Sequence, residues 1–420
     1  MSPSSREDVP LPRGSAFSGG AIALWLLVAL FIAGHIYLNV LTLKDTAFTD
    51  FHVYHEALGR AARGETVYDL NSPMPFLYPP FFLIMLWPMG WLNEPTAAMV
   101  WLHLQNLFLL VSLLALLTSF RPFKFSLLAW TIILFTGFSP VMLNNLYGQT
   151  NLLYLVILSV FILAYLRSGR TGILPVTGSV GFQPAIRHGQ DAHATVWEVV
   201  AALTLSLAIS IRILPIALLV FAGIQRRNRI VLWTVGFVLA EALAAGALVG
   251  FATEWRYFTS SMFHLHGLEN MREISLLALA QRLIPFPGLA ALMFTVLLAA
   301  GLGMFFVWVC GPMRRLLPSV ALHIAFVIAS MVLFAPLLEY HHYTILLAPY
   351  TLILGDLTRR SQLRLTSALP VFLSWAIVGG ANQLSHYQFG AVAFVALAGA
   401  ALVWAYSISL ITGHASTPAS

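Results

Sequence analysis

A short segment, FTDFHVYHEAL, carries a carboxylate directly beyond the first long apolar run of the chain. Asp50 lies where that run ends, so its side chain is expected near the membrane boundary. A carboxylate there can accept the proton of a substrate hydroxyl as a general base. A competing interpretation is that Asp50 caps a helix, because Phe51, Tyr54 and Leu58 follow at the spacing of a short amphipathic helix on the membrane.

A second group of polar residues interrupts the apolar segment FAPLLEYHHYTILLAPY. Glu339, His341 and His342 lie at the expected end of a late membrane span. Neighbouring imidazoles can donate hydrogen bonds to a phosphate or carboxylate, and they titrate near neutral pH. The alternative is that these are interfacial residues of the aromatic belt.

A charged residue, Arg212, lies inside the apolar segment SLAISIRILPIALLV, close to Pro215. A charge at mid-bilayer costs about 2.5–3.5 kcal/mol on insertion scales. Arg212 must therefore face the protein interior or a wet cavity. It could form an internal ion pair with Glu241, or a bent helix could present it to an anionic group. Arg272, in a later polar segment, is a further candidate for binding phosphate.

Amide side chains are concentrated in NNLYGQTN, between two apolar runs. Gln149 and Asn151 belong to this segment. Amides this close to hydrocarbon must meet one another, a helix end or a ligand. The segment is either a capped turn or a set of amides that binds sugar hydroxyls. A loosely spaced pair, His264 and His266, is too weak a pattern to predict a metal site, so no metal is expected.

The elements that must position these residues are membrane helices. Of 420 residues, 59% are hydrophobic and 9% are charged. A soluble domain carries roughly a quarter charged residues, so the composition excludes a soluble enzyme, a disordered chain and a nucleic-acid-binding protein. Cys310 is the single cysteine, which excludes an intramolecular disulfide. We expect an all-α, polytopic integral membrane protein.

The apolar runs predict about twelve transmembrane helices, since a span needs about 20 residues. The first, 21–43, is interpreted as an uncleaved signal anchor after a cytoplasmic tail, 1–20. A single membrane-embedded domain, 21–412, then includes two outer loops, 44–76 and 254–286, with short amphipathic helices. Segment 168–197 is expected to be a flexible insertion, and 413–420 to be a C-terminal tail.

Basic residues in short loops predict the orientation, because they favour the cytoplasmic side. The two outer loops and the adjacent histidines then face outward, on the periplasmic or extracellular face of the cell (inner) membrane. Two topologies are open for 77–225. Spans either alternate simply, or 77–92 is re-entrant and 198–224 is a hairpin bent at Arg212–Pro215. The basic residues that favour the cytoplasm in both are Arg6, Arg13, Arg226, Arg227, Arg229, Arg314, Arg315, Arg359, Arg360 and Arg364.

In order and spacing these features resemble glycosyltransferase family 87, integral membrane enzymes of the GT-C superfamily. Members include α-mannosyltransferases that use polyprenyl-phosphate mannose. The resemblance runs from the first span to roughly Tyr350. The residues that carry it are Asp50, Gly64, Val67–Tyr68, YPPF at 78–81, GQTN at 148–151, Arg212 to Pro215, Arg226–Arg227, and Pro336 followed by His341–His342.

The resemblance implies that Asp50 is the catalytic base and that His341 or His342 lies beside the donor phosphate. It implies transfer of a hexose, by the family mannose, from a polyprenyl-phosphate sugar to a glycolipid or glycan hydroxyl. We expect inversion, because Asp50 would activate the acceptor on the face opposite the leaving phosphate. No cofactor and no nucleic acid is expected, and the partners are membrane lipids. The predicted substrate-binding residues are Tyr54, Tyr68, Tyr78, Gln149, Asn151, Arg212, Arg272 and Glu339.

Two other classes of membrane protein are the alternatives. A lipid-linked polysaccharide polymerase or ligase would also use a large outer loop. A secondary transporter should show inverted repeats and paired broken helices at mid-bilayer. The sequence offers one broken-helix candidate and no internal repeat, and its polar residues are concentrated in outer loops.

Overall fold

A computed structural model describes residues 26, 29, 33–34, 48–69, 71–120, 124–169, 185–260, 274–310, 319–381 and 389–413. Throughout these residues every regular element is a helix, which confirms the all-α prediction for them. Several predicted features lie outside the described residues: most of the first span, residues 170–184 of the insertion 168–197, the tail 1–20, nearly all of 413–420, and Arg272 with His264 and His266. The prediction of a flexible insertion is wrong for residues 185–197, because they form the first part of the helix Ala185–Ile211.

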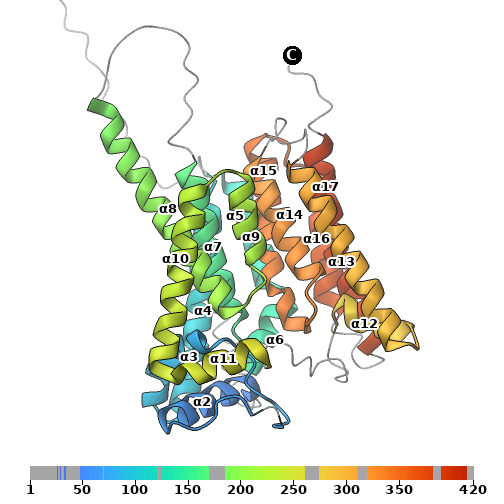
Figure 1. Cartoon of the computed structure of the whole chain (residues 1–420). Coiled ribbons are helices and arrows are strands. Elements are labelled where there is room, and N and C mark those ends of the chain that lie inside the picture. Colours follow the sequence, from blue (N-terminus) through green and yellow to red (C-terminus); the bar gives the residue numbers. More distant parts are fainter. Residues whose placement is uncertain are drawn as a thin grey trace, which may run out of the picture.

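The helices pack side by side along one main direction, with short helices crossing one end (Figure 1). Their bounds, in chain order, are α2 Thr49–Ala62, α3 Pro80–Leu86, η1 Trp87–Trp91, α4 Glu94–Thr118, α5 Phe125–Thr136, α6 Ser139–Tyr147, α7 Asn151–Ser168, α8 Ala185–Ile211, α9 Ile216–Ile224, α10 Asn228–Ala245, η2 Gly246–Gly250, α11 Phe251–Thr259, α12 Leu276–Leu283, α13 Pro287–Cys310, α14 Val320–Leu333, η6 Tyr340–Leu346, α15 Leu347–Arg359, α16 Leu365–Ala381 and α17 Phe389–Gly413.

Several of these helices can cross a membrane. In the described part of the chain five are long and apolar enough, and the pair α5 and α6, bent by 48°, makes up to six. Shorter apolar helices, among them α14 and α16, accompany them. The chain is therefore a multi-pass membrane protein, and the number of twelve spans stays a prediction. The five are Glu94–Thr118, Asn151–Ser168, Ala194–Ile211, Asn228–Thr259 and Val392–Thr412.

Helices α8 and α10 run parallel, which decides between the two predicted topologies. Arg229, at the start of α10, lies 3.7 Å from Glu198, in the middle of α8. Further along both, Ser206 donates a 2.7 Å hydrogen bond to Glu241. Because the contacts advance in the same direction, the chain between them must return to the level of Glu198, and α9 makes this return (Figure 1). Simple alternation, with 198–224 as one span, is therefore wrong. The segment is a hairpin that turns at Arg212–Pro215.

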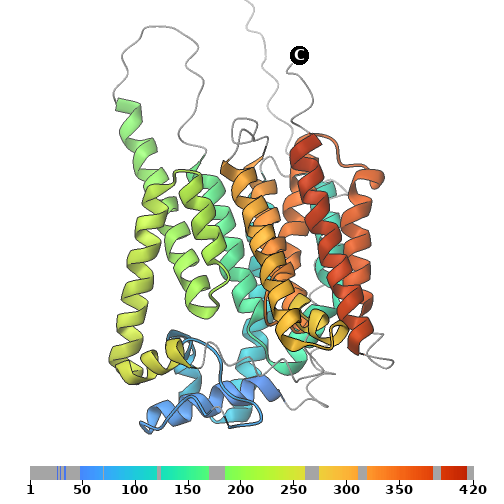
Figure 2. The same ribbon diagram turned by 45° about the vertical axis from the view of Figure 1, so that its right-hand side comes forward.

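The segment 77–92 also stays at one end of the bundle, beside α2. Its first part contacts α2 through Phe82, whose ring centroid is 5.4 Å from that of Tyr54. Its last residue, Leu92, has its carbonyl oxygen 3.1 Å from His55 Nε2 of the same helix. Figure 2 shows α2 lying across this end of the upright helices. The segment is therefore re-entrant, as the second topology predicted.

The opposite end of the bundle carries most of the described basic side chains. Lys124 Nζ donates to Thr358 O at 3.0 Å, at the end of α15, and Arg167 donates to Thr118 O at 3.1 Å, at the end of α4. Here they meet helix C-terminal carbonyls, whose partial negative charge favours cations. We call this the basic end, and the other the α2 end. The residues of the basic end are Lys124, Arg167, Arg226, Arg227, Arg229, Arg359, Arg360 and Arg364.

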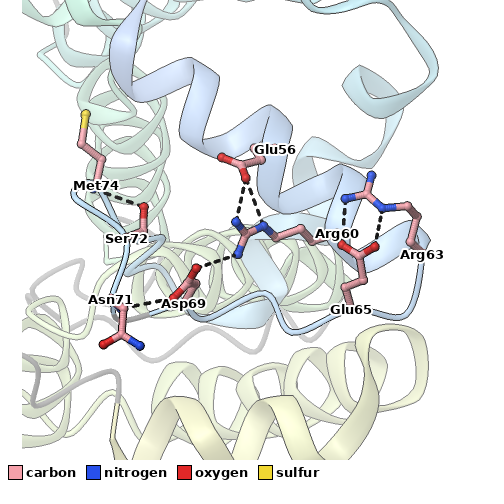
Figure 3. A network of polar contacts seen from close by, with 8 residues as sticks. All are labelled: Glu56, Arg60, Arg63, Glu65, Asp69, Asn71, Ser72 and Met74. Atoms are coloured by element: carbon pink, nitrogen blue, oxygen red, sulfur yellow. Dashed lines mark hydrogen bonds and ion pairs between the residues drawn. The ribbon is translucent and has the colours of Figure 1, made fainter.

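Helix α2 is amphipathic, as its spacing predicted: Phe51, Tyr54 and Leu58 are buried on one face. A polar network on its outer side orders the loop that follows (Figure 3). The guanidinium of Arg60 pairs with two carboxylates: Nη2 lies 2.8 Å from Glu56 Oε1, and Nη1 lies 3.4 Å from Asp69 Oδ2. These contacts tie the loop back onto α2 and so fix the orientation of the helix that carries Asp50.

Candidate active site

The carboxylate of Asp50 is in the first turn of α2, not at its cap. The residue in the N-cap position is Phe48, and no side chain caps the helix, so the capping interpretation is wrong. Instead, Gln149 Nε2 donates a hydrogen bond to Asp50 Oδ2. The carboxylate therefore meets the turn between α6 and α7 at the α2 end.

That turn reaches α2 because it contains Gly148, which ends α6 in the left-handed region at φ +70°. A Cβ at this position would lie 2.7 Å from the Cβ of Phe51, closer than real Cβ contacts allow. Trp101 Nε1 donates to Gly148 O at 2.8 Å and fixes the turn from behind. Glycine alone combines this backbone conformation with so close an approach.

Two tyrosines hold the amide of Gln149 in place. Its Oε1 accepts from Tyr54 OH at 3.1 Å and from Tyr78 OH at 3.3 Å. Burial raises the pKa of Tyr54 well above its usual value, so its hydroxyl stays protonated and can donate. Because Oε1 of Gln149 already accepts both tyrosine hydroxyls, its NH₂ group must face Asp50. Tyr68 OH donates to Tyr78 O at 2.7 Å and supports the arrangement.

Asn151 is placed inside the turn, away from Asp50. Its backbone N and its Nδ2 donate to Asn144 Oδ1 at 3.0 and 3.1 Å, and both residues are fully buried. For this pair the capped-turn interpretation holds. Of the two predicted sugar-binding amides, the structure brings only Gln149 to the carboxylate.

Arg212 occupies the break between α8 and α9. Its guanidinium carbon lies 6.0 Å from the ring centroid of Tyr78 and 5.9 Å from that of Tyr154. These distances allow cation–π attraction. The predicted ion pair with Glu241 is wrong, since Glu241 instead accepts from Ser206 and Ser210 at 2.7 and 2.5 Å.

The adjacent histidines lie in the first turn of η6, directly after Tyr340. The backbone N–H of Glu339 donates to His342 Nδ1 at 2.9 Å, so a neutral His342 carries its proton on Nε2. His341 Nε2 lies 3.5 Å from Glu339 Oε2, and the two imidazole centroids are 4.5 Å apart. Tyr340 anchors the segment, because its hydroxyl donates to Gly379 O at 2.9 Å.

Arg212 and His342 line a common small hollow together with Tyr154. The sequence analysis did not single out Tyr154, because a tyrosine in an apolar helix is ordinary core composition. Arg212 also contacts Tyr78, so it connects the hollow with the Asp50 network. The remaining lining is apolar: Leu214, Met331, Val332, Ala335, Leu337, Leu338 and Ile345.

The structure thus gathers residues from distant segments at the α2 end. The Asp50 carboxylate is linked through the Gln149 amide to the hydroxyl of Tyr78, and the guanidinium of Arg212 lies 6.0 Å from the ring centroid of the same tyrosine. Among the described residues no three His, Cys, Asp or Glu side chains form a metal-binding group, and metal independence stays a prediction. The predicted residues in this network are Asp50, Tyr54, Tyr68, Tyr78, Gln149, Arg212, Glu339, His341 and His342.

Comparison with solved structures finds ArnT from Cupriavidus metallidurans in two states. The apo structure matches with a TM-score of 0.48 and 15% identity, over 93% of this chain and 78% of that chain. The structure bound to undecaprenyl phosphate matches with a TM-score of 0.43 and 13% identity, over 92% and 77%. None of the curated protein sequences compared with the chain matches it.

The sequence model of glycosyltransferase family 87 matches residues 76–338. The match contains Tyr78, Gln149 and Arg212, whereas Asp50 and the histidine pair lie outside it. It covers more than half of the chain. The protein therefore belongs to glycosyltransferase family 87 and is a membrane glycosyltransferase.

Proposed function

We propose that the protein transfers a hexose, specifically mannose, from a polyprenyl-phosphate sugar to a hydroxyl of a glycolipid or glycan acceptor, with inversion. One observation carries the proposal. The Asp50 carboxylate and the Arg212–His342 hollow are connected through one residue, Tyr78, whose hydroxyl donates to the Gln149 amide that holds Asp50 and whose ring Arg212 contacts. An inverting transfer needs a base and a leaving-group site that both reach the anomeric carbon, and this connection supports their placement in one site.

The surroundings of the hollow support a lipid-linked donor. Apart from Arg212, His342 and Tyr154 its lining is apolar, and it lies at the break of a helix that otherwise crosses the membrane. A polyprenyl phosphate keeps its tail among apolar groups and its phosphate near the headgroup plane. The lining offers both environments within one small volume.

In the proposed reaction Asp50 accepts the proton of the acceptor hydroxyl while that oxygen bonds to the anomeric carbon. The bond from that carbon to the phosphate oxygen breaks, and its electron pair leaves with the polyprenyl phosphate. Arg212 and the Nε2–H of His342 stabilise the charge that develops there. Preorganised donors of this kind contribute about 3–4 kcal/mol each to transition-state stability.

The sidedness of the site follows from charge. Basic residues favour the cytoplasmic side of a membrane, and the basic end is opposite the α2 end. We therefore place the chemistry on the periplasmic or extracellular face of the cell membrane. The donor and the acceptor are then both reached from that face.

The test is transfer by the purified protein from synthetic polyprenyl-phosphate mannose to a glycolipid acceptor. We expect single mannose residues in the product, with a configuration opposite to that of the donor. Transfer of preassembled oligosaccharide blocks from a polyprenyl diphosphate would instead support a polymerase or ligase. Retention of configuration would contradict the proposed roles of Asp50 and Arg212.

A further inference from the structure

The hydroxyl of Tyr154 is a buried polar group without a protein partner. The side chain is 1% exposed, and among the described residues its hydroxyl makes no hydrogen bond. Buried hydroxyls in folded proteins are nearly always hydrogen-bonded, so each exception requires an explanation. A ligand or a buried water in the neighbouring hollow would supply the missing partner.

The neighbours of Tyr154 define what the partner should be. The guanidinium of Arg212 lies 5.9 Å from its ring centroid, and His342 lines the same hollow with its Nδ1 already occupied by Glu339 N. The groups that remain are a guanidinium, an imidazole N–H and a phenol O–H, all of which can donate. The lining includes no carboxylate. Three donors around one hollow favour an anion over a neutral ligand.

We propose that Tyr154 is a binding residue for the phosphate of the lipid donor, with its hydroxyl donating to a non-bridging phosphate oxygen. This inference rests on the proposed function, because it adds a third donor to the site of Arg212 and His342. Only Arg212 carries a fixed charge in the lining, which suits the single negative charge of a sugar phosphodiester.

The experiment compares Tyr154→Phe with the unaltered protein, using undecaprenyl phosphate and undecaprenol as probes in detergent micelles. Phenylalanine keeps the ring that Arg212 contacts and removes only the hydroxyl. We expect the affinity for the phosphate to fall by about tenfold or more, as for the loss of a hydrogen bond to a charged group. Binding of the alcohol should not change.

A matched control is Tyr165→Phe on the same helix. Tyr165 is equally buried and lies on the same face of α7, about three turns further along, where it is roughly 16 Å from Tyr154 by helical rise. It packs against Arg227 at the basic end. We expect this variant to bind undecaprenyl phosphate like the unaltered protein.

Different failures point to different errors. If the unaltered protein does not prefer undecaprenyl phosphate to undecaprenol, the proposed donor class is wrong and this inference falls with it. If the preference is present and Tyr154→Phe keeps it fully, the hydroxyl contacts a buried water only and the inference alone is overturned. Equal losses in both variants would also overturn it, since they would show a general packing effect.

Discussion

The side-chain amide of Gln149 donates a hydrogen bond to the carboxylate of Asp50, although the two residues are 99 positions apart. The other end of the same amide accepts from Tyr54 and Tyr78. A rotation of the amide would break all three contacts, so its orientation is fixed. The position of the proposed base therefore depends on the turn between α6 and α7 as much as on α2.

Replacing Asp50 by Asn should lower the rate of sugar transfer by about two to four orders of magnitude, the typical contribution of a general base. The change keeps the shape of the side chain, so lipid-phosphate binding should persist. The measurement is kcat with polyprenyl-phosphate mannose, beside the affinity for undecaprenyl phosphate. The control is Asp69→Asn, a carboxylate of the same outer loop paired with Arg60. Turnover of folded Asp50→Asn at the unaltered rate would remove Asp50 as the base.

The Gln149→Leu variant should lower kcat by about tenfold or more, because it removes the amide that donates to the Asp50 carboxylate and accepts from Tyr54 and Tyr78. The KM for the lipid donor should change little, since Gln149 does not line the hollow proposed to hold the phosphate. Gln225→Leu, a glutamine at the basic end, serves as the control. A rise in KM with kcat unchanged would contradict the positioning role of Gln149.

The Gly148→Ala variant tests the close approach of the turn to α2. The Cβ would lie 2.7 Å from that of Phe51 at a backbone φ of +70°. We expect lower kcat and a loss of about 2–4 kcal/mol in stability, from backbone strain together with overpacking. Gly64→Ala is the matched control, since Gly64 has the same φ of +70° but no atom within 4 Å of the added Cβ. Thermal unfolding in detergent and kcat should separate the two, and equal effects would exclude the clash as the cause.

Arg212→Gln should raise the KM for the lipid donor by about tenfold or more, because it removes a charge-assisted hydrogen bond to the phosphate. Arg212→Lys should retain part of the affinity through its charge. The companion variant is Glu241→Gln, whose carboxylate accepts from Ser206 and Ser210. If Arg212 and Glu241 acted as an ion pair, the two neutral variants would shift KM alike. We expect a shift for Arg212→Gln alone.

The orientation can be measured by labelling single cysteines in a Cys310→Ala background with a membrane-impermeant maleimide. Glu65→Cys and Arg229→Cys suit this purpose, since the side chains they replace are 52% and 72% exposed and lie at opposite ends of the bundle. In intact cells or spheroplasts the cysteine at position 65 should react and the one at position 229 should not. The reverse pattern would place the proposed site in the cytoplasm.

Local features of the fold could be predicted because they depend on neighbouring residues. The amphipathic helix α2 follows from the spacing of Phe51, Tyr54 and Leu58, and the structure buries that face. The break at Arg212–Pro215 was equally visible. The sequence did not show whether the chain continues or reverses at this break, because the same local sequence is compatible with either path. The packing of α8 against a parallel α10 decided it.

By itself the sequence determined a helical membrane protein and the residue types that could act on a sugar phosphate, because composition and apolar run length decide how a chain meets the bilayer. Only the tertiary structure decided which polar residues meet. It directed Gln149 to Asp50 and Asn151 into the turn, and it placed Tyr154 beside Arg212 and His342. Hydrogen bonds depend on distances between atoms in space, and residues distant along the chain acquire those distances only when the helices pack.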